Sequence, residues 1–301
     1  MQARLLSEPR QEDPRHEIEI LRALHPPGER CTNVTALVGD FFDENYLFVL
    51  LEFADGGAVH APWCPHAAAI FILHEHTFTL THAHMNTTTP PPPPPPPPPS
   101  HLIATFNLTG ELFDKVAAEG TITEDVARVY FCDIMRGVAY IHSHGICHRD
   151  LSLENVMLVS DAASGREVAK IIDFGLALSM PEDGSPLNLD GACGQVGKLP
   201  YMAPEVYENR PFDGRAIDIW AVGIMLFTML VGGPPHAIPT RRDARFEAIV
   251  DGRLLEVLTA WACTELVPPP AQDLLNRMLL ENGGARLSVA AIDAHAWTRG
   301  G

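Results

Sequence analysis

The sequence predicts an α+β fold built from two unequal lobes, of which the larger is mainly helical. From residue 111 onward, apolar residues recur at helical spacing, and short strand-like runs lie between these segments. Before residue 58, a helix-like segment is followed by two apolar runs that predict a β-hairpin. Residues 58–110 fit neither pattern. We therefore expect a small lobe at 1–57, an insertion at 58–110 and a helical lobe at 111–298.

The small lobe is predicted to hold one helix and two or so strands. Apolar spacing indicates a helix over 17–24, which the His-Pro-Pro-Gly run at 25–28 ends. Apolar, β-branched or aromatic residues fill 34–42 and 46–53, and the polar triplet at 43–45 separates them. This pattern is typical of a hairpin of two antiparallel strands.

The large lobe is predicted to be a helical assembly. Amphipathic spacing favours helices at 124–143, 215–230, 244–251, 271–280 and 288–294. Short β-prone runs at 156–159 and 169–172 predict two strands between the first and second of these helices.

The insertion at 58–110 has a composition of its own. Ten consecutive prolines occupy 90–99, and histidines are frequent before them. A proline run forms an extended polyproline helix that does not join a core, so we expect 58–110 to be a solvated, disordered insertion. Two alternatives are a partner with a Pro-recognising domain at 90–99 and a metal site at the His-x-His pairs, His74/His76 and His82/His84.

Composition restricts the classes of partner. A net charge of −17 argues against a nucleic-acid or anionic-membrane surface and suits basic partners. No run of about eighteen apolar residues predicts a membrane-spanning helix, and residues 1–16 have no signal-peptide pattern. The six cysteines form no Cys-x-x-Cys pair, so we expect reduced thiols in the cytoplasm or nucleus.

Three short motifs carry the chemistry. His-Arg-Asp at 148–150 continues to Asn155, and it is followed by Asp-Phe-Gly at 173–175 and Ala-Pro-Glu at 203–205. In this order they resemble the eukaryotic protein kinase family of the serine/threonine type. The resemblance implies a two-lobed kinase fold that uses ATP and Mg²⁺. It makes Asp150 the base that accepts the substrate hydroxyl proton, and Asn155 and Asp173 the Mg²⁺ ligands.

The resemblance also assigns supporting roles. Arg149 would gather the activation segment, Asp218 would hold the backbone of the catalytic loop, and Glu205 with Arg286 would form a buried ion pair. The 17–24 helix resembles the kinase αC helix. In the nucleotide site, the residues implied are Glu17, Leu51, Glu52, Ala54, Met157 and Asp173. Of these, Leu51 would be the gatekeeper, 52–54 the hinge that meets adenine, and Met157 the floor under the adenine ring.

The nucleotide side departs from the family pattern. Active kinases cover the phosphates with a Gly-rich loop and pair a strand lysine with the αC glutamate. Here nothing before Glu17 resembles that loop, and no lysine precedes Lys115. We therefore expect Glu17 to face water without a partner, and ATP affinity and rate to be reduced. The alternative function is a catalytically inactive scaffold, which retention of Asp150, Asn155 and Asp173 disfavours.

The insertion interrupts the family pattern at one point. Joining Gly57 directly to Glu111 runs the kinase hinge into the helix that follows it, with no residue to spare. One hypothesis is that 58–110 is translated non-coding sequence. The other is a genuine insertion that leaves the lobes joined by a long tether.

A second departure lies beside the catalytic base. Serine/threonine kinases usually carry a lysine two residues after this aspartate and a threonine shortly before Ala-Pro-Glu. This chain has Ser152 and Gly197-Lys198 at those places. We hypothesise that Lys198 is catalytic because it restores the positive charge that Ser152 lacks. The alternative is a solvent-exposed loop lysine.

Acidic residues indicate the substrate class. Glu111, Glu154 and Glu247 match positions where kinases of the calcium/calmodulin-dependent branch hold basic residues of their substrates. We expect protein substrates with basic residues near the target serine or threonine. The alternative is three solvated surface glutamates.

Overall fold

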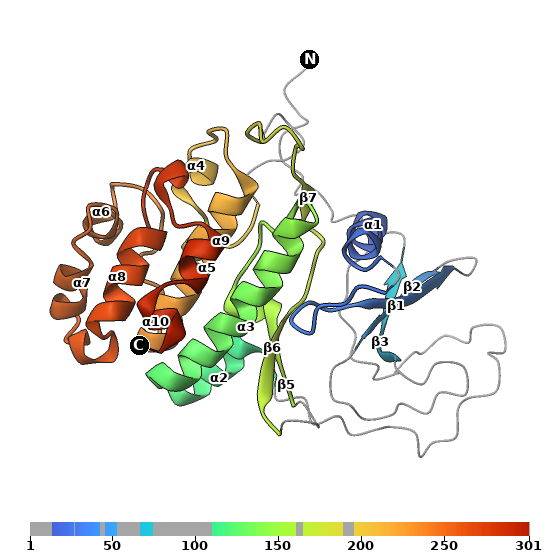
Figure 1. The fold of residues 1–301 in the computed structure, drawn as a ribbon, viewed down its shortest axis with the longest axis horizontal. Coiled ribbons are helices and arrows are strands. Elements are labelled where there is room, and N and C mark those ends of the chain that lie inside the picture. The colour runs from blue at the N-terminus through green and yellow to red at the C-terminus, as the bar shows by residue number, and fades with distance from the viewer. Residues whose placement is uncertain are drawn as a thin grey trace.

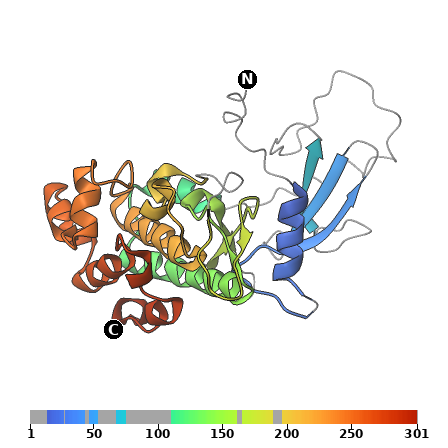
Figure 2. The ribbon, with the colours of Figure 1, turned by 90° about the horizontal axis from the view of Figure 1, so that it is seen from above.

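The computed structural model describes residues 14–26, 28–42, 46–52, 67–74, 110–160, 165–188 and 196–300. They form two parts, which Figure 1 shows side by side: a small part with helix α1 and a three-stranded sheet, and a large, mainly helical part. Seen from above in Figure 2, the small part lies at one end of the molecule. The predicted α+β class is therefore confirmed.

The small part begins with α1 (Pro14–Leu24), three residues earlier than the predicted start. Proline is well tolerated in the first turn of a helix because its missing N–H has no intrahelical partner there. The predicted hairpin is confirmed: β1 (Leu37–Phe42) pairs antiparallel with β2 (Tyr46–Glu52). Buried Ile18, Leu21 and Leu24 turn one face of α1 toward the core.

The structure differs from the sequence prediction in one piece of the insertion. Residues Ala67–His74 form β3, which pairs antiparallel with the second edge of β2 over its full length. The run Ala-Ala-Ala-Ile-Phe-Ile-Leu is apolar and β-prone, and the free edge of β2 offers it unpaired backbone groups. The prediction that all of 58–110 is disordered therefore does not hold for this strand. The proline run and the other three histidines of the proposed metal pairs lie outside the described residues.

The large part is built on α-helices that the sequence largely predicts. Its helices are α2 (Leu112–Glu119), α3 (Glu124–Ser143), α4 (Pro204–Tyr207), α5 (Gly214–Val231), α6 (Ala244–Val250), α7 (Leu254–Ala260), α8 (Pro269–Met278), α9 (Val289–Asp293) and α10 (Ala296–Arg299). Two short ladders accompany them, β4 (Ile146–Cys147) with β7 (Leu178–Ser179) and β5 (Val156–Ser160) with β6 (Glu167–Ile171). The prediction for α3 has the observed bounds, whereas α4, α7 and α10 were not predicted.

Helix α5 is the centre of the core. Sixteen of its residues are buried, among them Trp220, and it packs against α3 and α8. Among the described helices, α5 alone is long and apolar enough to cross a membrane by length and composition, and 89% of it is buried inside the protein. Its apolar surface is thus already covered by its own fold.

The end of α5 depends on a glycine. Gly232 has φ +90°, and a Cβ at this position would lie 2.1 Å from the carbonyl oxygen of Gly120. Only glycine satisfies both the left-handed backbone and this close approach. The contact brings the end of α2 against the end of α5.

The two parts are joined through β6. The backbone of Ile171 donates to Asn33 O and accepts from Thr35 N, both at 2.9 Å, and the Asn33 side chain donates to Ala169 O at 3.0 Å. This short ladder fixes the segment between α1 and β1 on the large part. Of the six cysteines, the four that the structure describes are free thiols: Cys31, Cys132, Cys147 and Cys263.

Candidate active site

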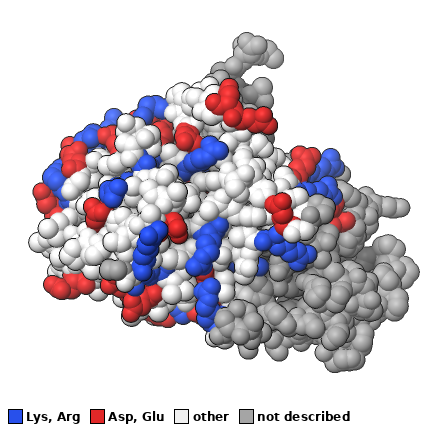
Figure 3. Space-filling view, viewed as in Figure 1, with Lys and Arg blue, Asp and Glu red and all other residues white. Residues whose placement is uncertain are grey.

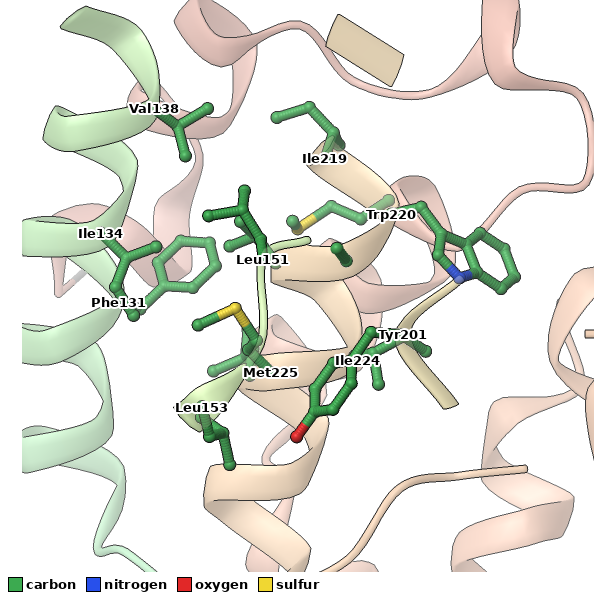
Figure 4. Packing of buried hydrophobic residues seen from close by; sticks show 14 of the residues in the cluster. Phe131, Ile134, Val138, Leu151, Leu153, Tyr201, Ile219, Trp220, Ile224 and Met225 are labelled. Carbon is green, nitrogen blue, oxygen red and sulfur yellow. The ribbon is translucent and has the colours of Figure 1, made fainter. Parts of the chain in front are cut away.

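The catalytic-loop segment is anchored by two leucines. Leu151 and Leu153 are 1% and 0% exposed, and Figure 4 shows them between α3 and α5 among Phe131, Ile134 and Met225. Polar residues alternate with these leucines, at Asp150, Ser152 and Glu154. Burial of the apolar side chains therefore fixes the loop that presents the polar ones.

Asp218 holds the start of this loop from α5. Its carboxylate is 1% exposed and accepts the backbone N–H of His148 at 2.9 Å and that of Arg149 at 3.0 Å. Arg149 has φ +70°, a left-handed conformation that costs a non-glycine residue of order 1–3 kcal/mol. The Asp218 bonds offset that cost. His142 on α3 contacts the same carboxylate, with Nε2 2.8 Å from Oδ2.

The Asp150 carboxylate is held by two residues of the predicted set. Its Oδ1 accepts the backbone N–H of Lys198 at 3.2 Å, and its Oδ2 accepts Nδ2 of Asn155 at 2.8 Å. The same Nδ2 also donates to the Asp150 carbonyl at 2.7 Å, which orients the Asn155 amide. Burial raises the pKa of the Asp150 carboxyl, and the Lys198 ammonium is the strongest influence that lowers it.

The Lys198 ammonium lies within a group of catalytic-loop oxygens. Nζ donates to Ser152 Oγ at 2.7 Å and to Asn155 Oδ1 at 3.4 Å. The carboxylates of Asp150 and Glu154 lie 3.9 Å and 3.8 Å from it. The side chain is 37% exposed, and it is held by the catalytic loop through its bonds to Ser152 and Asn155.

Gly197 allows this approach. It has φ +93°, and a Cβ there would lie 2.9 Å from the carbonyl oxygen of Arg149. The residue before Lys198 must therefore be glycine for the two segments to meet. Asp150 and Lys198 line the same pocket, together with apolar Val206 and Ile217.

Asp173 and Phe174 connect the site to α1. Asp173 has φ +64° and accepts the N–H of Gly175 at 3.2 Å, which closes a tight turn. The Phe174 ring is fully buried and lies 4.9 Å from the ring of His148. The backbone N–H of Phe174 donates to Glu17 Oε1 at 3.1 Å.

This last bond corrects the prediction for Glu17. We expected a carboxylate that faces water without a partner, and that expectation is wrong. Glu17 is half-buried and accepts from the loop that carries Asp173. A buried amide needs an acceptor, and the glutamate on α1 supplies one whether or not a lysine reaches it.

Asn155 and Asp173 are suited to Mg²⁺. Both offer hard oxygen atoms, which this ion prefers, and Mg²⁺ usually takes one or two protein carboxylates together with phosphate oxygens and water. Within the described ranges, no cluster of three or more His, Cys, Asp or Glu side chains could hold a metal. The donor set thus fits a metal that arrives with phosphate.

The predicted nucleotide pocket is described only in part. Leu51 is 8% exposed in the core, and Met157 is half-buried where its backbone bridges to Glu111. Glu52 is the last residue of β2, and Ala54 lies outside the described residues.

Glu205 and Arg286 form a two-pronged buried pair. The two guanidinium nitrogens donate to the two carboxylate oxygens at 2.6 Å and 2.8 Å. Arg286 also donates to the carbonyls of Ala216 and Leu280, and its guanidinium lies 5.0 Å from the centre of the Trp220 ring. The pair therefore ties α4 to α5 and to the segment before α9.

Two of the three predicted substrate glutamates lie together. Burial raises the pKa of Glu111, and the nearby carboxylates of Asp114 and Glu154 raise it further, whereas Lys198 lowers it. Glu247 lies on α6, where its carboxylate is 3.9 Å from Arg241. No contact among the described residues joins Glu247 to the other two.

Sequence reasoning missed three contributors to the site. His142 binds Asp218, Gly197 permits the Lys198 approach, and Nε2 of His16 on α1 lies 2.7 Å from the carbonyl of Ala177. Only Gly197 had a signal in the sequence, namely a glycine beside a predicted site residue. The two histidines lie on helix faces where their partners cannot be inferred from spacing.

Comparison with known proteins agrees with this geometry. A family model described as protein kinase domain matches residues 96–298. The chain is 36% identical over 197 residues to serine/threonine-protein kinase CHK1 of Mycosarcoma maydis, which covers 65% of this chain and 28% of that protein. It is 35% identical over 196 residues to serine/threonine-protein kinase SRK2C of Arabidopsis thaliana, covering 65% and 54%. It is also 36% identical over 188 residues to CBL-interacting protein kinase 1 of Oryza sativa subsp. japonica, covering 62% and 37%.

The matches extend over part of each protein. The chain spans about half or less of the length of these curated relatives, from 28% to 54%. The family match covers more than half of the present chain, and it includes Asp150, Asn155, Asp173 and Lys198. The chain therefore belongs to the protein kinase domain family.

Proposed function

We propose that this protein transfers the γ-phosphate of ATP to serine or threonine residues of other proteins. The observation that carries the proposal is the arrangement around Asp150. One oxygen of this carboxylate accepts the Lys198 backbone N–H, and the other accepts the amide of the metal-ligand candidate Asn155. Base, metal ligand and cation are thus fixed to one another. The relatives reported above are named as protein kinases, two of them serine/threonine-protein kinases.

In the proposed reaction, Asp150 holds the substrate hydroxyl and takes its proton. The bond from the γ-phosphorus to the bridging oxygen breaks as the bond to the hydroxyl oxygen forms, and ADP leaves. When bound, Mg²⁺ neutralises phosphate charge, and Asn155 and Asp173 would hold it. Asp150 must be ionised to accept a proton. The Lys198 ammonium favours that state against the effect of burial.

A phosphorylation assay of the full chain tests this function. We expect Mg²⁺-dependent labelling of serine and threonine peptides and none of tyrosine peptides. Asp150→Asn should lower the rate about 100- to 10,000-fold, the range that general bases contribute. Asp293→Asn is the matched control, because this exposed carboxylate on α9 is remote in sequence from every motif. Equal rates for the wild type and Asp150→Asn would overturn the proposal.

A catalytically inactive scaffold is the second candidate. The observation that bears on it is the bond from the Phe174 amide to the Glu17 carboxylate, which gives this carboxylate a partner within the described fold. Saturable, Mg²⁺-dependent binding of ATP that Asp173→Asn weakens would oppose the scaffold. Absence of nucleotide binding, with the fold intact by circular dichroism, would favour it.

We propose basic protein segments as the preferred substrates. Support comes from the acidic group at Glu111, Asp114 and Glu154, where repulsion between carboxylates raises the pKa of Glu111 and the Lys198 ammonium opposes it. A bound arginine would relieve that repulsion further. Figure 3 shows acidic and basic side chains interspersed on the visible face, so the net charge of −17 is not concentrated there.

Glu154→Gln should reduce the preference for peptides with arginine near the target more than Glu247→Gln does. Glu154 acts on a bound arginine together with Glu111 and Asp114, whereas Glu247 lies apart from this group, on α6 beside Arg241. Equal effects of the two substitutions would contradict this assignment.

The other predicted partners stay predictions. A Pro-recognising domain at 90–99 is tested by a pull-down with SH3 or WW domains, and no binding would remove it. We also propose a location in the cytoplasm or nucleus without a nucleic-acid or membrane partner, which fluorescence microscopy of the tagged chain tests.

A further inference from the structure

The Lys198 ammonium has more hydrogen-bond donors than its neighbours in the structure use. An ammonium has three N–H donors. Among the described residues, two acceptors take Nζ donors within hydrogen-bond distance, namely Ser152 Oγ at 2.7 Å and Asn155 Oδ1 at 3.4 Å. The next oxygens belong to the carboxylates of Glu154 and Asp150, which lie at 3.8 Å and 3.9 Å, beyond hydrogen-bond distance, so one donor can bond to a ligand.

The two Lys198 bonds differ in length, and this difference would let the ammonium move away from Asn155 while it stays bound to Ser152. Ser152 is fully buried, and the short bond to its hydroxyl fixes the end of the lysine side chain. The bond to Asn155 is long and correspondingly weak, so it breaks at small cost. If Asn155 held a metal ion, the ammonium could leave the Asn155 oxygen and keep its bond to Ser152.

The surrounding charge also favours a phosphate ligand. Phosphoryl transfer proceeds by neutralising charge on the oxygens of the transferring group. The carboxylates of Asp150 and Glu154 lie within 4 Å of the Lys198 ammonium. Without this cation, the two negative charges would repel a phosphate. Cation and base are therefore adjacent, which the reaction requires.

We propose that Lys198 contacts the γ-phosphate during transfer, with Ser152 as its buried anchor, so that the activation segment supplies the catalytic cation. This inference rests on the proposed kinase function. The backbone N–H of Lys198 binds Asp150 while its side chain binds the phosphate, so one residue sets the distance between base and transferred group.

Nucleotide binding tests the proposal without catalysis. The measurement is the affinity of the full chain for Mg·AMP-PNP and for Mg·ADP, taken from thermal shifts over a range of nucleotide concentrations. Lys198→Met should weaken the triphosphate analogue about tenfold, a loss of about 1.4 kcal/mol, and leave the diphosphate unchanged. Lys115→Met is the matched control, since this lysine pairs with Glu119 and Glu167 on α2 and β6. Equal loss of both nucleotides in Lys198→Met would overturn the proposal.

Activity provides the second test. Lys198→Met should lower kcat about 100- to 1,000-fold with little change in KM for peptide, as expected for loss of an interaction made in the transition state. Ser152→Ala should have a smaller effect, because the cation remains. The transposed variant Ser152→Lys/Lys198→Thr should recover at least tenfold over Lys198→Met, since the new lysine occupies the space that the old one leaves. A transposed variant that folds and shows no recovery would contradict the inference.

The failures are distinguishable. If the wild type binds both nucleotides and Lys198→Met keeps the full triphosphate preference, this inference fails and the proposed function stands. If the wild type binds neither nucleotide, the proposed function fails and the inference fails with it.

Discussion

His236 is a core residue whose burial is costly, and its replacement tests the energetics of the large part. It is 1% exposed between the rings of Trp220 and Phe246, whose centres lie 6.0 Å and 5.4 Å from its own. Within the described structure, neither ring nitrogen has a hydrogen-bond partner. Such a site accepts a neutral imidazole at some cost and an imidazolium at much greater cost.

The structure sets the size of the effect. Burial lowers the pKa of His236 from 6.5 to about 4, with Asp243 opposing the shift and Arg245 adding to it. Between these values the unfolded chain binds the proton and the folded chain does not, so the free energy of unfolding falls as the pH falls. The slope is about 1.4 kcal/mol per pH unit. From about pH 7.5 to pH 5, this histidine alone removes about 2 kcal/mol.

Urea unfolding of three proteins at several pH values measures this effect. The variants His236→Phe and His236→Leu do not titrate at this position. Their stability relative to the wild type should therefore increase by about 2 kcal/mol as the pH falls from about 7.5 to 5. The offset at pH 7.5 will differ between the variants because the side chains fill the space differently. The shared pH dependence isolates the titration from the packing.

One result would refute the reasoning. If the stability difference between each variant and the wild type is the same at every pH, the folded protein binds the proton as readily as the unfolded chain does. His236 would then have a partner that the described structure does not give it.

Three further substitutions test the contacts that position the site. Arg286→Met should lower the free energy of unfolding by about 3–5 kcal/mol, because it leaves the Glu205 carboxylate buried without its partner. The double variant Glu205→Leu/Arg286→Met should lose much less stability. Equal losses for the two variants in urea titrations would contradict this. Asp218→Asn should cost about 1–3 kcal/mol and slow peptide phosphorylation, because an amide offers the catalytic loop one acceptor oxygen in place of two; an unchanged rate would show that the loop does not depend on it. Glu17→Ala should speed hydrogen exchange at the Phe174 amide while Glu17→Gln should not, and unchanged exchange in both would remove the contact between α1 and the site.

The helical core was predictable because its signals agree. α5 combines an Asp213 N-cap, a glycine after its last turn and an apolar face throughout, and α3 has regular apolar spacing. α7 was missed because Leu-Leu-Glu-Val-Leu-Thr-Ala is short and contains the β-branched residues Val and Thr, so its periodicity does not separate helix from strand. β3 was missed because the composition around 67–74 masked a short β-prone run.

The sequence predicted which residues form the candidate site, but not all of the contacts that these residues make. Motif spacing indicated Asp150, Asn155 and Asp173 because their chemistry requires fixed positions along two loops. The bond from the Phe174 amide to Glu17 could not be predicted, since its donor is a backbone group that leaves no trace in side-chain patterns. The position of Lys198 against Ser152 depends on two segments meeting through Gly197, which only the fold determines.

The origin of the insertion is a separate question that transcripts answer. Full-length transcripts can be sequenced across the codons for Gly57 and Glu111. If 58–110 is translated non-coding sequence, the transcripts should lack this segment. Transcripts that encode the segment would instead support a genuine insertion, in which β3 completes the sheet beside β2.

The most direct test of the account is single-turnover transfer from labelled Mg·ATP to a basic serine peptide, with the full chain in excess over nucleotide. This measurement separates nucleotide binding from the chemical step. The account predicts that the wild type transfers label, and that Asp150→Asn binds ATP with similar affinity and transfers it at least about 100-fold more slowly. Binding without transfer by the wild type, or equal transfer by both proteins, would contradict a catalytic role for this site.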